Sequence, residues 1–106
     1  MQKAYMIWEM EATLPNLFLA DGKRAAVITC TDTASRRVMS HVVDAESGEA
    51  VVECLREAIK AWGTPREVVT DNSKVFSSCY VSRVLQYAGI THTRKSPFMP
   101  TVGEGR

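Results

Sequence analysis

Hydrophobic and polar side chains alternate at the start of the chain, between Tyr5 and Ala12. One set comprises Tyr5, Ile7, Glu9 and Glu11, and the other comprises Met6, Trp8, Met10 and Ala12. Successive side chains of a β-strand point to opposite faces of a sheet, so this period of two predicts a strand. Large apolar groups in both sets favour a central strand that carries carboxylates toward its C-terminal end.

A hairpin and one further strand are predicted before the first helix. Leu17 to Ala20 and Arg24 to Thr31 flank Asp21-Gly22, a dipeptide that tolerates the positive φ of a hairpin turn. A short turn at Asp32 to Ser35 then leads into another strand at about Arg37 to Val43. We therefore expect sequential antiparallel strands in this part of the chain.

A helix is expected next. Ser47 is a candidate N-cap, and Gly63 with Pro65 forms a stop signal at the other end. Between them, apolar residues recur at three- and four-residue intervals, as on one face of a helix: Val52, Leu55, Ile59 and Trp62.

The rest of the chain alternates between strand and helix patterns. A short β-rich strand, Glu67 to Thr70, ends in the turn formers Asp71-Asn72-Ser73. A second helix is expected from a cap at Ser77 or Ser78 to Gly89, then a fifth strand at Ile90 to Arg94, and a loop over Lys95 to Arg106. The order β-β-β-α-β-α-β predicts an α/β fold, in which a five-stranded mixed sheet carries helices packed on it.

Length and composition narrow the class of protein. The 106 residues, 45% hydrophobic and 24% charged, are typical of one globular domain, and a net charge of +1 neither demands nor excludes a polyanionic partner. Cys30, Cys54 and Cys79 lack the spacing of a zinc site and are expected as buried or free thiols. Without an apolar run long enough for a membrane span, a cytoplasmic protein is expected.

Two carboxylates are the best candidates for chemistry. Glu11 ends the first predicted strand and Asp71 ends the fourth, and sites in α/β sheets form at the carboxyl ends of strands. If the two strands are parallel neighbours, both carboxylates project at one edge, where Mg²⁺ would offset their repulsion. The alternative is that both are ordinary solvated turn residues.

Four stretches, in order, resemble the motifs of one family. Residues 8–13 (Trp-Glu-Met-Glu-Ala-Thr) resemble W-x-M/L-D-x-T, and residues 32–36 (Asp-Thr-Ala-Ser-Arg) resemble D-x-x-S-R. Residues 63–78 resemble G-x-P followed by T-D-N-G-x-x-F-x-S, and residues 88–100 resemble G-I followed by S-P-x-x-P. This series is similar to the catalytic core of DDE-type transposases and retroviral-type integrases, with the second stretch typical of bacterial Mu-like and insertion-sequence members.

The resemblance implies a ribonuclease H-like fold and a DNA-modifying activity. In that family, phosphodiester hydrolysis and strand transfer depend on two Mg²⁺ or Mn²⁺ ions, which Asp71 and Glu11 would bind here. Transposon ends and target DNA would be the partners, with no membrane, and a homodimer or higher multimer is expected by analogy. Lys74, Arg94 and Lys95 are candidates for contacts with DNA phosphates.

The chain departs from the family pattern in three places. Glu11 stands where the family has Asp, and Ser73 stands where it has a turn Gly. The third catalytic residue, a Glu, is expected just past Arg106, so Glu104 is the in-chain candidate and residues 1–106 are expected to form a single core domain cut short before its final helices. A catalytically inactive remnant that contacts DNA or protein, and a ribonuclease H-type nuclease, are the alternative functions.

Other conspicuous residues are expected to be structural. Asp32 should lie far from Glu11 and form a turn anchor with Arg36. His41 and His92 are isolated from other metal ligands, and Trp8 and Trp62 are predicted to lie in the core: none of these four is expected at a metal site.

Overall fold

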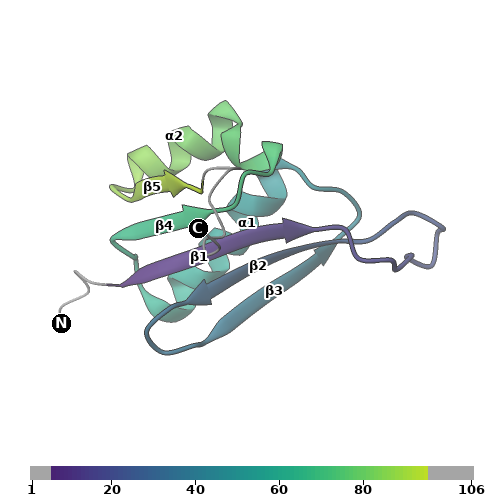
Figure 1. Ribbon diagram of the computed structural model, residues 1–106, viewed down its shortest axis with the longest axis horizontal. Helices are drawn as coiled ribbons and strands as arrows, with labels where there is room; N and C mark the ends of the chain where they lie inside the picture. Colours follow the sequence, from purple (N-terminus) through teal and green to yellow (C-terminus); the bar gives the residue numbers. More distant parts are fainter. Residues whose placement is uncertain (1–5, 96–106) are drawn as a thin grey trace, which may run out of the picture.

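A computed structural model describes residues 6–95 as a five-stranded sheet with two α-helices (Figure 1). The elements are β1 (Ile7–Thr13), β2 (Ala26–Asp32), β3 (Val38–Val43), α1 (Gly48–Trp62), β4 (Glu67–Thr70), the 3₁₀ helix η1 (Lys74–Ser77), α2 (Cys79–Tyr87) and β5 (Thr91–Arg94). The predicted order of strands and helices is confirmed. Tyr5 and the loop predicted beyond Lys95 lie outside the described residues.

Strand β1 lies at the centre of the sheet, as its alternation predicts. The strand order is β3-β2-β1-β4-β5, with β1 antiparallel to β2 and parallel to β4, while β5 is parallel to β4. In Figure 1, α1 lies behind the sheet and α2 lies beside β5. The mixed sheet follows from the connections, since hairpins join antiparallel strands and helical crossovers join parallel ones.

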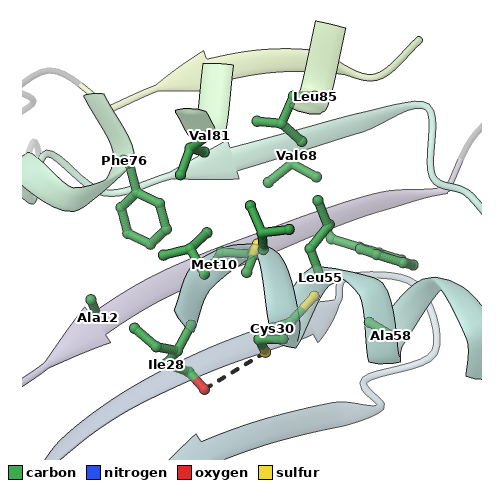
Figure 2. Packing of buried hydrophobic residues seen from close by; sticks show 14 of the residues in the cluster. Met10, Ala12, Ile28, Cys30, Leu55, Ala58, Val68, Phe76, Val81 and Leu85 are labelled. Carbon is green, nitrogen blue, oxygen red and sulfur yellow. Dashed lines mark hydrogen bonds between the residues drawn. The ribbon is translucent and has the colours of Figure 1, made fainter. Parts of the chain in front are cut away.

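The hydrophobic core fills the space between the sheet and the helices. Trp8, Met10 and Ala12 of β1 are buried, whereas the intervening Glu9 and Glu11 are exposed on the other face. The buried set packs with apolar residues of the neighbouring strands and both helices, shown in Figure 2: Ile28, Cys30, Val68, Leu55, Ala58, Val81 and Leu85. One face of β1 therefore belongs to the core, and its carboxylates belong to the opposite face.

Local capping signals set the ends of both helices. The Ser47 hydroxyl accepts a hydrogen bond from the N–H of Ala50 (3.1 Å), and the Ser78 hydroxyl accepts one from the N–H of Val81 (3.2 Å). Gly63 and Gly89 follow the two helices with φ of 92° and 76°, values that favour glycine. The predicted caps are confirmed, with Ser78 chosen over Ser77.

The expected hairpin around Asp21-Gly22 is only partly formed. Gly22 has φ of 88° and the turn exists, but Leu17 to Ala20 contributes a single bridge, Phe18 to Arg24, in place of a strand. The prediction of a strand arm was wrong because the side chain of Phe18 is 65% exposed, with no layer of the core to cover it.

The turn after β2 is anchored by Asp32, as expected, but through a different arginine. The buried Asp32 carboxylate accepts the Ser35 hydroxyl (2.6 Å) and lies 3.6 Å from Arg37 Nη2. Arg36 was expected in this role, yet it contributes only its backbone N–H to the Asp32 carbonyl, because it has φ of 68° at the tight corner. Burial alone would raise the pKa of Asp32, but hydrogen bonds from Ser35 and Ala34 and the charge of Arg37 lower it.

Trp8 and Trp62 pack edge to face, with ring centroids 5.4 Å apart, and the guanidinium of Arg37 lies over the Trp62 ring.

All three cysteines are free thiols, and burial raises the pKa of Cys54 to about 11, which keeps that thiol protonated. Among residues 6–95, neither helix has the length and apolar character that a bilayer crossing requires.

Candidate active site at the ends of strands β1 and β4

Glu11 and Asp71 lie on adjacent parallel strands. Glu9 pairs with Val69 and Met10 with Thr70, and the N–H of Asp71 donates to the Met10 carbonyl at 3.3 Å. The next residues along both strands, Glu11 and Asp71, therefore lie side by side at the carboxyl end of the parallel pair. The predicted juxtaposition of these two strands is confirmed.

A polar hollow opens at this edge of the sheet. Its volume is about 70 Å³, and it is lined by residues of β1, β2, the turn after β4 and the end of β5: Glu9, Met10, Glu11, Thr31, Asp71 and Lys95. Glu9 and Thr31 were not predicted from the sequence to lie at this site. The alternation along β1 contained the signal for Glu9, because residues two apart share a face.

The turn that carries Asp71 is held by its own carboxylate. Asp71 Oδ1 accepts the N–H of Ser73 at 2.9 Å, an arrangement typical of Asx turns. Ser73 has φ of −62°, so the position occupied by Gly in the family pattern needs no left-handed backbone here. Phe76, completely buried in η1, fixes the segment that follows to the core.

Strand β5 supports the same turn from its other side. His92 Nε2 is 2.9 Å from the Thr70 hydroxyl, and Arg94 Nη2 donates to the Ser73 carbonyl at 3.1 Å. The N–H of Lys95 donates to the Thr70 carbonyl at 2.9 Å. His92 was expected to have a surface or core role, and its contact with Thr70, the residue before Asp71, was not predicted. Burial, with the nearby charge of Arg94, lowers the pKa of His92.

The paired carboxylates fit a hard divalent cation. Among the ion pairs of residues 6–95, none involves Glu11 or Asp71, and the basic side chain that shares their hollow is Lys95. No group of three or more His, Cys, Asp or Glu residues in this range is arranged to enclose a metal. Two carboxylates with water and substrate oxygens completing the shell is a common arrangement for Mg²⁺. Glu104 lies outside the described residues.

A second, larger hollow lies between the helices and has different chemistry. It measures about 260 Å³ and is lined by α1 and α2, mainly with apolar side chains: Val52, Leu55, Arg56, Ile59, Lys60, Tyr80, Val84 and Ala88. No carboxylate lines it. Of these two hollows, the smaller one combines strand ends with acidic groups, and it is therefore the candidate active site.

Residues 2–100 match the sequence model of the integrase core domain. The chain belongs to the integrase core domain family. This assignment confirms the resemblance drawn from the motifs, and the observed sheet with its two helices is the ribonuclease H-like fold expected of such a domain.

This integrase core domain is similar to a Pol-related polyprotein and to solved integrase structures. It is 28% identical over 99 residues to the Intracisternal A-particle Pol-related polyprotein of mouse intracisternal A-particle MIA14, covering 93% of the chain and 11% of that protein. The HTLV-2 integrase catalytic core domain in complex with magnesium, in its trimeric form, superimposes with a TM-score of 0.75 and 21% identity over 86% of the chain and 59% of that structure.

Two other solved structures share the fold. The dimeric form of the same HTLV-2 core domain, also in complex with magnesium, gives a TM-score of 0.74 and 20% identity over 88% of the chain and 63% of that structure. The simian T-cell lymphotropic virus intasome, in complex with PP2A regulatory subunit B56 gamma, superimposes with a TM-score of 0.79 and 23% identity. The match covers 92% of the chain and 34% of the matched chain of that structure. The integrase core domain thus spans less than two thirds of each of these relatives.

Proposed function

We propose that this integrase core domain cuts and joins DNA strands by metal-dependent phosphoryl transfer, as the catalytic core of a transposase or integrase. The observation that carries the proposal is the position of Glu11 and Asp71, which both follow the last residue pair of the parallel β1–β4 ladder and line one hollow. Membership of the integrase core family supports it. The magnesium complexes of the HTLV-2 core domain support Mg²⁺ or Mn²⁺ as the metal.

Each residue at the hollow has a proposed task. Asp71 would bind both metal ions, with its orientation restrained by the Ser73 N–H, and Glu11 would share in binding them. A bound divalent ion would stabilise the charge on the attacking and leaving oxygens of the phosphate. Lys95 lines the hollow and Lys74 is exposed at the start of η1, so both are placed to attract DNA phosphates, together with Arg94. Glu104 remains the proposed in-chain substitute for the third carboxylate.

The proposed reaction needs no covalent bond between protein and DNA. A water molecule, and in a later step a 3′-hydroxyl, would attack a phosphodiester in line with the leaving oxygen. The carboxylates position the reacting groups, and the lysines neutralise phosphate charge. The partners are transposon or viral ends and target DNA, and a multimer is proposed because relatives are found in dimeric, trimeric and intasome forms.

Calorimetric titration of the chain with Mn²⁺ tests the site. Wild type should bind the ion, and Asp71→Asn should weaken binding at least about tenfold, because it removes one of the two charges. Glu53→Gln is a matched control, since it neutralises an exposed carboxylate on α1 outside the hollow, and it should leave the affinity unchanged.

Glu11→Asp tests the departure from the family pattern. Its shorter side chain should restore the ligand geometry of the family and strengthen Mn²⁺ binding, with more nicking of plasmid DNA. If neither wild type nor Glu11→Asp binds Mn²⁺ or cuts DNA, the enzyme proposal is lost.

The glutamate at position 11 favours a second candidate function, an inactive remnant that still contacts DNA or protein. That reading predicts salt-dependent DNA binding without metal binding, which fluorescence anisotropy would detect. Preferential cleavage of an RNA–DNA hybrid would instead indicate a ribonuclease H-type nuclease.

A further inference from the structure

The end of β5 is tied to the turn after β4 by a chain of contacts that leads to Asp71. Arg94 Nη2 donates to the carbonyl of Ser73 (3.1 Å), and the N–H of the same Ser73 donates to Asp71 Oδ1 (2.9 Å). One side chain of β5 thereby holds the residue that orients the Asp71 carboxylate. We propose that Arg94 is a positioning residue for Asp71, an inference that rests on the proposed function.

Arg94 is itself held in place on both sides. Its backbone pairs with Thr70 of β4, and the next residue, Lys95, donates its N–H to the Thr70 carbonyl at 2.9 Å. His92, two residues earlier, contacts the Thr70 hydroxyl, which is buried. Because β5 is fixed to β4 in this way, the guanidinium reaches the Ser73 carbonyl from a rigid base.

The turn needs such support because of where it lies. Asp71-Asn72-Ser73 leaves the sheet after β4, once the N–H of Asp71 has bonded the Met10 carbonyl of β1 at 3.3 Å. The side chain of Ser73 makes no capping hydrogen bond to η1. From outside the turn, the Arg94 side chain bonds the Ser73 carbonyl, which also accepts the N–H of Phe76 at 3.1 Å. Removing it would let the carboxylate of Asp71 sample more orientations, and supporting hydrogen bonds of this kind tune metal affinity.

A simple charge role makes the opposite prediction for metal binding. If Arg94 acted only as a cation, it would repel a divalent ion, and replacing it by a neutral residue would tighten binding. At about 1 M KCl, where the screening length is about 3 Å, that charge effect is largely suppressed while the hydrogen bond to Ser73 persists. High salt therefore separates positioning from charge.

Arg94→Met and Arg94→Lys test the inference. Met has similar bulk without a donor, and Lys retains both donor and charge. In 1 M KCl we expect Arg94→Met to weaken Mn²⁺ binding about three- to tenfold, as the loss of one hydrogen bond would, and Arg94→Lys to recover most of it. Arg83→Met, at an exposed arginine on α2, is the control and should have no effect. Unchanged or tighter binding by Arg94→Met would overturn the proposal.

Amide hydrogen exchange gives a readout that does not depend on metal. The N–H of Ser73 should exchange about three- to tenfold faster in Arg94→Met, while the N–H of Val68 in β4 should be unchanged, which shows that the sheet is intact. Equal protection of Ser73 in Arg94→Met and wild type would refute the positioning role. If wild type bound no Mn²⁺, the proposed function would fail, whereas the exchange result would still decide whether Arg94 holds the turn.

Discussion

Phe76 is expected to link the stability of the core to the geometry of the candidate site. Its side chain is fully buried (0% exposed) in η1, directly after the turn that carries Asp71, and packs in the core cluster with Val81 and Leu85. Phe76→Ala should cost about 3 to 5 kcal/mol in the free energy of unfolding, from lost burial and the cavity left behind. A domain of this kind has a total stability of about 5 to 15 kcal/mol, so the change is severe.

Urea denaturation followed by tryptophan fluorescence measures the effect. With a slope of about 1.5 kcal/mol per M, the midpoint should fall by about 2 to 3 M. Phe76→Leu keeps most of the apolar volume and should cost only about 1 kcal/mol, which provides a variant that stays folded. Phe18→Ala makes the same chemical change at a side chain that is 65% exposed, and should cost less than about 0.5 kcal/mol. Similar midpoints for Phe76→Ala and Phe18→Ala would refute the reasoning.

Two further predictions concern pH and helix capping. Because the folded pKa of His92 lies below its ordinary value, the unfolded chain takes up a proton first, so stability is full above about pH 6.5 and falls as the pH drops toward the folded pKa. His92→Gln should reduce the loss of stability between pH 7.5 and 5.5 in urea titrations. An identical loss in both proteins would contradict a lowered pKa of His92 in the folded state. Ser47→Ala should cost about 1 kcal/mol because the N–H of Ala50 loses its acceptor, whereas Ser82→Ala, at an exposed position inside α2, should be nearly neutral in the same assay.

Local signals in the sequence were sufficient for most of the secondary structure. The alternation in β1, the caps at Ser47 and Ser78, and the glycines after each helix act over a few residues, through side-chain direction and backbone hydrogen bonds. Their outcome depends little on the rest of the chain. The same locality explains why Asp71 could be recognised as a residue that ends a strand and begins a turn.

Contacts between distant segments could not be read in this way. The hairpin pattern at Asp21-Gly22 looked complete, but no part of the core covers Phe18, so only one bridge formed. Arg36 and Arg37 are adjacent arginines, and the sequence does not show which of them pairs with Asp32. In the structure Arg36 has a positive φ at the corner of the turn, and the Arg37 guanidinium lies over the Trp62 ring and pairs with Asp32. The contact of His92 with Thr70 exists only because β5 lies beside β4.

The candidate site depends on both kinds of information. The chain by itself indicated that Glu11 and Asp71 lie toward the carboxyl ends of two strands, and its motifs pointed to the integrase core. In the structure β1 continues past Glu11 to Thr13, and Asp71 directly follows β4. Only the tertiary structure brought the two carboxylates to one hollow with Glu9 and Lys95, and joined Arg94 to the Asp71 turn. The physical reason is that strand periodicity and capping are encoded within a few residues, whereas strand order is decided by which arrangement buries Trp8, Met10 and Val68 under the helices.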